Sequence, residues 1–279
     1  MKHAPPFEWI PRGGSEWAEG SPLAGSDLPP ILRQLILQRG MAGDEDLEAF
    51  LRPLLKNLSD PFLLEGMDQA VARILRAVDE GQAICIFGDY DVDGVTSIAL
   101  MKRILQAYGV EARTFIPRRS SEGYGLSTAA IERCMSEGVK PDLLITVDCG
   151  TVSVAEIAAL QADGVDVVVI DHHEPLLEER PACHALVNPK CCGHLTYLCA
   201  AGVVFKLGHA LLKARPAALD LRQVLDLVAV ATISDIVPMV GENRLLVRHG
   251  LQRLPQTLNP GLKALQEVTR MHAHATSMD

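Results

Sequence analysis

Three aspartates stand within five positions of the chain, directly after an apolar run. The segment "AICIFGDYDVDG" places Asp89, Asp91 and Asp93 behind residues 83–87, which have the pattern of a buried strand. Carboxylates this close repel one another unless a positive charge lies among them. The spacing therefore predicts a bound cation, and the other acidic and histidine residues indicate which kind of site holds it.

Two further apolar runs end in side chains of the same kind. Asp148 follows "LLITV", and Asp171, His172 and His173 follow "VVVI". Because ligands bind beyond the carboxyl ends of parallel strands, we expect these side chains to meet at one edge of a sheet. Asp235 follows the helical pattern "AVATIS" and can fold back onto that edge. A single strand-end aspartate is more often a cap or turn residue, so the metal hypothesis depends on the whole set.

Carboxylate together with imidazole favours Mn²⁺, Mg²⁺ or Zn²⁺ over a thiolate-preferring ion. "DYDVDG" also matches the first half of an EF-hand calcium loop. Position 12 of that loop should be glutamate, however, and it is Leu100 here. "DVDGVT" is also similar to the D-x-D-G-T element of phosphatases that form an aspartyl phosphate. That interpretation gives no role to Asp171, His172 and His173, the "DHH" triplet.

Strand and helix patterns alternate from residue 84 to residue 188. Such alternation implies parallel strands joined by crossover helices, so the predicted fold class is α/β, a doubly wound parallel sheet flanked by helices. The expected strands are 83–87, 112–117, 142–148, 166–171 and 185–188, and the expected crossover helices are 95–109, 126–138 and 153–164. Helical patterns precede this region, one of them interrupted by Pro53, and others follow it.

These patterns predict three parts of the chain. Residues 1–69 form an N-terminal arm with helices, and the first 28 or so are rich in Pro, Gly and Ser. Residues 70–242 form the domain that contains the expected sheet and the candidate metal ligands. Residues 243–279 form a C-terminal connecting helix.

The composition is that of a globular protein, with 279 residues of which 48% are hydrophobic. A net charge of −9 argues against a large nucleic-acid footprint, because neutralising phosphates requires Lys and Arg. A metal site concentrates acids, however, and its cations offset them. We find neither a secretory signal nor a membrane-spanning stretch. The seven cysteines, three of them in apolar runs, favour reduced thiols and a cytoplasmic location.

Five segments stand in an order typical of one superfamily: "GDYDVDGVTS", "VDCG", "DHH", "NPK" and "ATISDIVP". From about residue 28 to its end the chain resembles the DHH phosphoesterase superfamily. "GDYDVDGVTS" and "GYGLS" (123–127) resemble the RecJ-type single-stranded-DNA-specific 5′→3′ exonucleases within it. The resemblance implies phosphodiester hydrolysis by a two-metal mechanism in DNA repair or recombination, with two Mn²⁺ or Mg²⁺ ions per chain. The implied partner is single-stranded DNA, with a single-strand-binding protein or a helicase as further candidates. The oligomeric state stays open.

The resemblance also implies roles for individual residues. The metal ligands would be Asp91, Asp93, Asp148, His172 and Asp235, with Asp148 bridging two ions and Asp89 as a ligand or support. His173 would meet the scissile phosphate, while Asp171 would orient a ligand. Related pyrophosphatases and small phosphodiesterases have a ligand histidine at the position of Phe87, so the outer ion would be held differently here.

Residues after the second expected strand are candidates for substrate binding. Arg118 and Arg119 can clamp a phosphate, although a solvated strand end is an equal alternative. Gly123 and Gly125 permit close backbone approach, and a phosphate can sit there. Ser127 can cap the following helix. Tyr124 either stacks on a base or packs within its loop.

Three functions remain open: a RecJ-type exonuclease core, a DHH phosphodiesterase for short oligonucleotides or cyclic dinucleotides, and a non-catalytic metal-binding module. "GDYDVDGVTS" with "GYGLS" favours the first, and the retention of all five main ligands disfavours the third. RecJ-type proteins usually continue into a second domain with a Gly-Gly-His motif and then an OB-fold. The resemblance therefore implies a fragment, a truncated form or a stand-alone catalytic core, with weak or absent processive degradation.

A cluster of Cys183, Cys191, Cys192, His194 and Cys199 lacks the paired C-x₂-C spacing of a zinc site. Ordinary thiols are the preferred interpretation of this cluster, with a structural zinc as the alternative.

Overall fold

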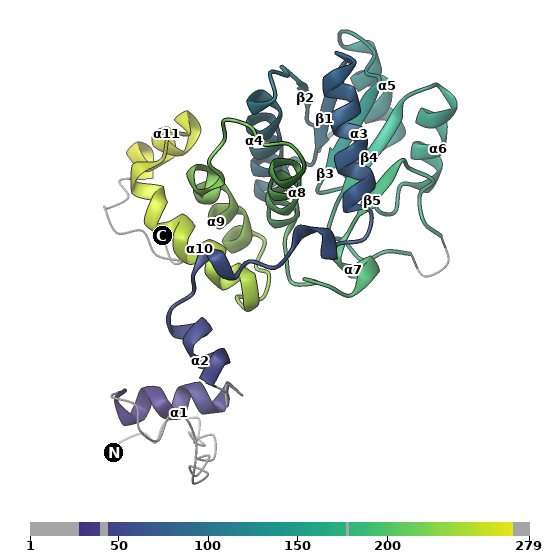
Figure 1. Cartoon of the computed structure of the whole chain (residues 1–279). Coiled ribbons are helices and arrows are strands. Elements are labelled where there is room, and N and C mark those ends of the chain that lie inside the picture. Colours follow the sequence, from purple (N-terminus) through teal and green to yellow (C-terminus); the bar gives the residue numbers. More distant parts are fainter. Residues whose placement is uncertain (1–27, 40–43, 177–178, 270–279) are drawn as a thin grey trace, which may run out of the picture. The chain divides into compact units, whose positions relative to one another are not determined.

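The computed structural model describes residues 28–39, 44–176 and 179–269 (Figure 1). The chain divides into two compact units, residues 1–57 and 58–279. The first contains helix α1 (Pro30–Gln38), helix α2 (Asp44–Leu51) and the 3-10 turn η1 (Leu55–Asn57). Helix α2 ends two residues before Pro53, in agreement with the predicted break.

The second unit contains a five-stranded parallel sheet, as predicted. Its strands are β1 (Ile84–Gly88), β2 (Arg113–Phe115), β3 (Leu143–Val147), β4 (Asp166–Ile170) and β5 (Ala185–Val187). They lie in the order β2-β1-β3-β4-β5, so the strand order reverses between β1 and β3. The register pairs Gly88 with Val147 and Val147 with Ile170. The residues that follow these three strands therefore emerge together at one edge, at the switch point where open α/β sheets bind ligands.

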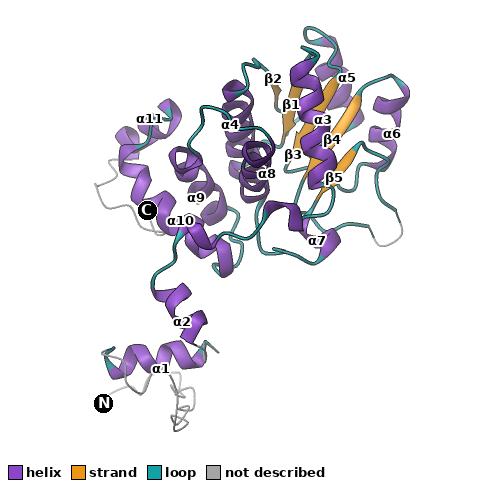
Figure 2. Cartoon of the chain, in the orientation of Figure 1, coloured by secondary structure: helices purple, strands orange, loops and turns teal. Residues whose placement is uncertain are grey.

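Helices cover both faces of the sheet (Figure 2). Helices α3 (Met67–Asp79), α4 (Val92–Ala107) and α8 (Ala200–Ala214) pack on one face, and α5 (Thr128–Ser136) and α6 (Val154–Ala162) pack on the other. Apolar side chains from both faces exclude water from the strands, which is why the strand sequences are almost continuously hydrophobic.

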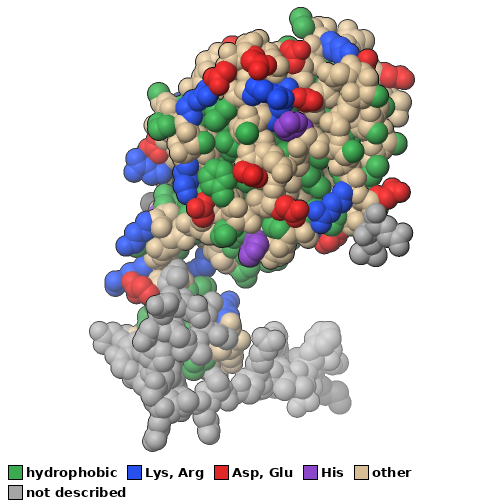
Figure 3. Space-filling view, turned by 45° about the vertical axis from the view of Figure 1, so that its right-hand side comes forward, with side chains coloured by type: hydrophobic (Ala, Val, Ile, Leu, Met, Phe, Trp, Pro, Cys, Tyr) green, Lys and Arg blue, Asp and Glu red, His purple; other side chains and the backbone are tan. Residues whose placement is uncertain are grey.

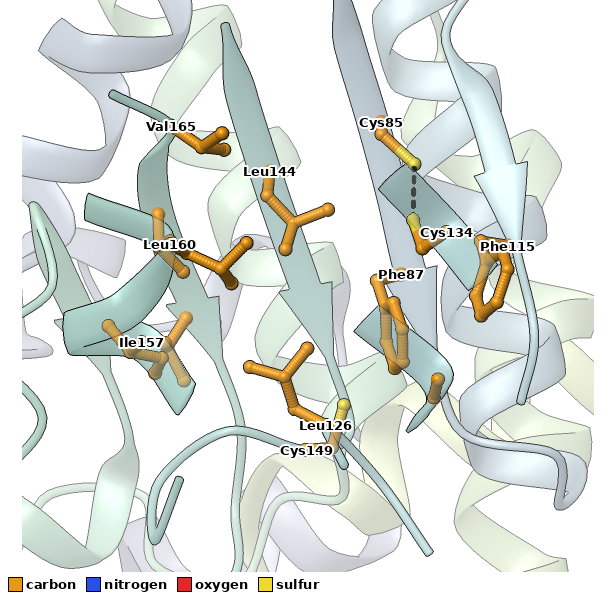
Figure 4. Close-up of a cluster of buried hydrophobic side chains, with 13 residues drawn as sticks. Cys85, Phe87, Phe115, Leu126, Cys134, Leu144, Cys149, Ile157, Leu160 and Val165 are labelled. Atoms are coloured by element: carbon orange, nitrogen blue, oxygen red, sulfur yellow. Dashed lines mark hydrogen bonds between the residues drawn. The ribbon is translucent and has the colours of Figure 1, made fainter. Parts of the chain in front are cut away.

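The core between the sheet and α5 and α6 is shown in Figure 4. Phe87 is fully buried there and stacks on Phe115 with 5.0 Å between ring centroids. The position that holds a ligand histidine in related phosphodiesterases therefore belongs to the apolar core in this chain. Cys85 and Cys134 also meet in this core, with 3.8 Å between their sulfur atoms.

The rest of the second unit consists of further helices and 3-10 turns. They are the turn η2 (Pro61–Leu63), α7 (Pro189–Cys192), η3 (Leu221–Val224), α9 (Leu225–Ser234), α10 (Gly241–Arg253), η4 (Leu254–Gln256) and α11 (Pro260–Thr269). Helix α9 packs on both α4 and α10. The region predicted as a single connecting helix thus contains two helices, α10 and α11, separated by a turn at Pro255.

A buried ion pair connects helices α8 and α10. The Lys206 ammonium on α8 lies 2.9 Å from Oε2 of Glu242 on α10 and 2.9 Å from the Ser59 carbonyl oxygen. The Lys206 side chain has no exposed surface, and the Glu242 side chain is 9% exposed. Removing one partner would leave the other charge buried alone, so the pair ties α8, α10 and the segment before η2 into one unit.

Within the described residues, no helix has the length and apolar character needed to cross a membrane. Acidic and basic side chains are interspersed over the face seen in Figure 3. All seven cysteines are free thiols, and four of them are buried. Among the described residues, the groups of ligand atoms close enough to hold a metal include none of the cysteines from Cys183 to Cys199.

Candidate metal centre

The turn after β1 fixes the first three aspartates. Asp91 is the N-cap of α4, and its Oδ1 accepts a hydrogen bond from the Gly94 backbone N–H at 3.0 Å. Asp89 and Asp93 are buried on either side of it. A Cβ atom at Gly94 would lie 2.5 Å from the Asp89 carbonyl oxygen. Glycine is therefore required where the first turn of α4 crosses the Asp89 backbone.

Asp148, at the end of β3, holds a strained conformation. Its φ angle is +61°, a left-handed value that costs a non-glycine residue on the order of 1 kcal/mol. Both carboxylate oxygens are buried and lack a hydrogen-bond partner. Burial raises the pKa of Asp148 to about 11, with Asp93 as the next cause. A buried carboxylate without a partner is costly, so these oxygens are free to ligate a cation.

His172 lies at the centre of the acidic side chains. Its Nε2 atom is 3.3 Å from Asp148 Oδ1, and 3.7 Å from both Asp93 Oδ2 and Asp235 Oδ2. Ligand atoms held at about 2.1 Å around one octahedral ion are themselves separated by about 3–4 Å. Burial lowers the pKa of His172 to about 4, which keeps its ring neutral. A neutral ring nitrogen without a hydrogen-bond partner is the form in which histidine ligates metals.

Two groups of ligand atoms that share no residue lie side by side. The first group consists of Asp89, Asp91 and Asp148, and the second consists of Asp93, His172 and Asp235. Within each group the ligand atoms lie within 4.8 Å of one another. Asp148 also groups with His172 and His173, and His172 is a member of the second group, so Asp148 connects the two. The structure thus brings together all six residues predicted as metal ligands. Oxygen with one imidazole is a donor set that fits Mn²⁺ or Mg²⁺.

The remaining members of the DHH triplet form a separate chain of contacts. Asp171 Oδ1 accepts a hydrogen bond from His173 Nδ1 at 2.7 Å, and its Oδ2 accepts one from the Thr151 backbone N–H at 3.0 Å. Burial opposes ionisation of Asp171, but the contacts with His173 and Thr151 outweigh it and lower the pKa. The hydrogen bond with Asp171 in turn raises the pKa of His173. Asp171 therefore orients His173 and leaves the side chain 40% exposed.

The residues predicted to bind substrate lie on the loop between β2 and α5. Arg118 and Arg119 are exposed, and the Arg119 guanidinium lies 5.3 Å from the centre of the Tyr90 ring. The Tyr124 hydroxyl lies 2.8 Å from His173 Nε2, so this side chain reaches the centre instead of packing within its own loop. Since Nδ1 of His173 contacts Asp171, Nε2 is the nitrogen left for Tyr124.

The small residues of "GYGLS" have backbone roles. Gly123 and Gly125 have φ angles of +84° and +62°, and a Cβ at Gly125 would lie 3.3 Å from Cys149 Cβ. The Gly125 backbone N–H donates to Asp89 Oδ1 at 3.4 Å. Ser127 caps α5 by accepting a hydrogen bond from the Ala130 backbone N–H. Gly125 is therefore packed against Cys149 and Asp89, whereas Gly123 has open space around it, and the phosphate contact predicted for these glycines stays a prediction.

One residue of the centre was not predicted. The Asn188 side-chain amide donates to Thr151 Oγ1 at 2.9 Å and to the His173 carbonyl oxygen at 2.8 Å. It joins the turn after β3 to the DHH triplet and is 1% exposed. The sequence did contain a signal for Asn188, since it stands in "NPK" directly after β5. Residues that follow parallel strands lie at the same edge of the sheet.

We expect Mn²⁺ to raise the Tm of the protein, and by more at about pH 8 than at about pH 5.5. Burial raises the pKa of Asp93 to about 7 and that of Asp148 to about 11. At about pH 5.5 the metal-free folded protein keeps both protons, and at about pH 8 it keeps that of Asp148, whereas the unfolded chain releases both near pH 4. Stability from this source is present below about pH 4 and is lost as the pH rises through the folded pKa values.

Binding of an ion removes those protons, so its stabilising effect grows as the pH rises. Thermal unfolding with and without excess Mn²⁺ at the two pH values measures this. A Tm increment that is equal or smaller at the higher pH would contradict the prediction.

Comparisons with known proteins place the chain in a family. Residues 83–232 match the model of the DHH family, N-terminal domain. The single-stranded-DNA-specific exonuclease RecJ of Bacillus subtilis is 40% identical over 241 residues, which cover 85% of this chain and 30% of that protein. RecJ of Thermus thermophilus is 36% identical over 255 residues, which cover 91% of this chain and 36% of that protein. The chain thus spans about a third of the length of these relatives.

Solved structures show the same likeness. A crystal structure of exonuclease RecJ bound to manganese matches with a TM-score of 0.69 at 36% identity, over 77% of this chain and 54% of that one. The Mn²⁺ complex of Thermus thermophilus RecJ matches with a TM-score of 0.71 at 33% identity, over 85% of this chain and 33% of that one. The family model covers more than half of this chain and includes both the three-aspartate turn and the DHH triplet. The chain therefore belongs to the DHH family.

Proposed function

We propose that this chain is the catalytic core of a single-stranded-DNA 5′→3′ exonuclease that uses two Mn²⁺ or Mg²⁺ ions and acts in DNA repair or recombination. The observation that carries the proposal is the buried, partnerless carboxylate of Asp148, which connects two groups of ligand atoms. The exonuclease names of its relatives, RecJ of Bacillus subtilis among them, support the choice of substrate.

The residues divide between holding ions and handling the phosphate. Asp89 and Asp91 would hold one ion, Asp93, His172 and Asp235 the other, and Asp148 would contact both. Two bound ions supply polarised phosphate oxygens, an acidified water molecule and a stabilised leaving oxygen. The chain then needs no nucleophilic side chain of its own.

In this proposal the phosphate lies against His173 and Tyr124. Asp171 holds the His173 ring by its Nδ1 atom, so Nε2 is presented to the substrate together with the Tyr124 hydroxyl. In this proposal both groups donate hydrogen bonds to phosphate oxygens, and His173 can carry its proton to the reacting group. Arg118 and Arg119, exposed on the same loop, would contact phosphates further along the strand.

The alternative of a phosphodiesterase for short oligonucleotides or cyclic dinucleotides is less well supported. Phe87 occupies the position of that group's ligand histidine and is buried against Phe115. A single-strand-binding protein or a helicase remains a proposed partner on the strength of the exonuclease function alone. We also propose a cytoplasmic location, where buried free thiols such as Cys85 and Cys134 stay reduced.

The test is hydrolysis of a 5′-labelled single-stranded oligonucleotide by the purified chain with Mn²⁺ or Mg²⁺. We expect label to leave as mononucleotide, with a trinucleotide and a cyclic dinucleotide cleaved at least about tenfold more slowly, since fewer phosphates contact the loop. A 3′-labelled oligonucleotide is the matched control for polarity, because its label should stay on long products.

Preferential cleavage of the trinucleotide or the cyclic dinucleotide would replace the exonuclease proposal with the phosphodiesterase alternative. Mn²⁺ binding without cleavage of any of these substrates would mean that the isolated chain is a metal-binding module.

A further inference from the structure

The loop of residues 116–127 between β2 and α5 carries three of the side chains proposed to meet the substrate, Arg118, Arg119 and Tyr124. It contains turns and bends but neither helix nor strand. A backbone without regular hydrogen bonds depends on side chains for its conformation. The question is what holds this loop so that the Tyr124 hydroxyl reaches His173 at 2.8 Å.

The carboxylate of Glu122, inside the loop, accepts several hydrogen bonds. Glu122 Oε2 accepts from the Arg118 backbone N–H at 2.7 Å and from Arg133 Nη2 at 2.9 Å, and Glu122 Oε1 accepts from Arg133 Nε at 2.5 Å. The side chain of Glu122 is only 9% exposed. This paired, two-oxygen contact with a guanidinium is the strongest kind of ion pair that side chains make.

Arg133, on α5, is itself held on several sides. Its Nη2 also donates to the Ile116 carbonyl oxygen at 2.8 Å, and its guanidinium lies 4.1 Å from the centre of the Phe115 ring. Nη1 contacts Glu137, one turn further along the helix, at 3.1 Å. Arg133 therefore joins the start of the loop at Ile116 to its middle at Glu122, with the end of β2 beneath it.

The C-terminal end of the loop is also hydrogen-bonded to Glu122. The Ser127 hydroxyl donates to the Glu122 carbonyl oxygen at 2.6 Å while capping α5. The hydrogen bonds from Arg133 lower the pKa of Glu122 to about 2, so this residue stays an anion. An anion so close to Arg118 and Arg119 would repel phosphate if Arg133 did not neutralise it.

We propose that Arg133 and Glu122 are positioning residues for the reaction, because together they hold the 116–127 loop in the conformation that presents Tyr124 and the two exposed arginines to the substrate. The inference rests on the proposed function for its effect on catalysis. Neither residue contacts the proposed ligands, so their loss should weaken substrate binding and leave the metal centre intact.

The first experiment measures the loop without using activity. Arg118 and Arg119 are tryptic sites, so the rate of trypsin cleavage after them reports how often the loop opens. We expect Arg133→Met and Glu122→Gln to increase that rate by about tenfold over the wild type. The matched control is Arg215→Met, which breaks an equally close two-bond pair with Asp79 at the end of α8. It should leave the rate unchanged.

The second experiment separates binding from chemistry. With single-stranded DNA, Arg133→Met should raise KM by about tenfold and lower kcat by less, with unchanged Mn²⁺ affinity. Arg133→Lys should recover part of the KM, since an ammonium neutralises Glu122 but cannot make the two-bond contact. Unchanged cleavage after Arg118 and Arg119 in both variants, or an unchanged KM in an active Arg133→Met protein, would overturn the inference.

The two proposals fail separately. If the wild type does not cleave DNA, the proposed function has failed. The proteolysis then decides alone whether Arg133 and Glu122 hold the loop.

Discussion

The Asp148→Asn protein is expected to lose metal-dependent hydrolysis by at least about 10³-fold and, when metal-free, to unfold at a higher temperature than the wild type. Asp148 belongs to the first group of ligand atoms, and its Oδ1 lies 3.3 Å from His172 Nε2 of the second, so a neutral amide in its place is expected to weaken both. The same carboxyl is a burden on the metal-free protein, because burial raises its pKa to about 11. At pH 7 the folded chain must take up a proton that the unfolded chain has released.

An asparagine needs no proton, so the substitution removes that cost. We expect a gain of about 2–4 kcal/mol at pH 7, or roughly 5–15 °C in Tm, and a weaker decline of stability as the pH rises. Thermal unfolding in chelator and hydrolysis with Mn²⁺ measure the two halves of the prediction. The matched control is Asp163→Asn at the exposed end of α6, which should change neither. A metal-free Asp148→Asn protein less stable than the wild type would show that Asp148 has partners other than a cation.

Lys206→Met is expected to cause the largest loss of stability, about 3–5 kcal/mol, which lowers Tm by roughly 6–20 °C. The substitution leaves Glu242 buried between α8 and α10 without its cation. Glu242 also accepts hydrogen bonds from the backbone N–H and the hydroxyl of Ser59, so its carboxylate cannot turn to solvent without breaking them. Urea unfolding monitored by circular dichroism gives the free energy of unfolding.

The double variant Lys206→Met/Glu242→Gln separates charge from packing. The glutamine side chain is neutral but still offers an oxygen to Ser59, so we expect it to restore at least half of the lost stability. A double variant as unstable as Lys206→Met would mean that the loss comes from packing of the lysine stem. Because this pair lies outside the groups of ligand atoms, Mn²⁺ affinity should stay unchanged in the folded variants.

The fold and the meeting of the candidate ligands at one edge could be predicted because they follow from short-range patterns. Apolar runs that alternate with helical patterns imply a parallel sheet, and a parallel sheet places the residues after its strands at one edge. Asp89, Asp148 and His172 needed nothing more. Asp235 was predicted from its position after a helical run, and the packing of α9 against α4 brings it within 3.7 Å of His172.

The parts that escaped prediction depend on irregular backbone. The contact of Tyr124 with His173 and the pairing of Glu122 with Arg133 require the conformation of a loop, which sequence periodicity does not describe. Lys206 escaped for another reason. Its helix is apolar on almost every side, and a lysine there reads as an exposed position until its buried partner from a distant helix is known.

The register that aligns Gly88, Val147 and Ile170 also has a consequence for folding. The groups that it gathers come from strands separated by whole helices, and no single crossover unit contains them all. A partly folded chain with only β1 and β2 in place has the first three aspartates but lacks their partners. Non-local strand pairings of this kind form slowly, because the chain must close long loops first. A cation bound at this edge would therefore stabilise only a chain in which these strands have already paired. We expect it to lower the rate of unfolding and to change the rate of folding little.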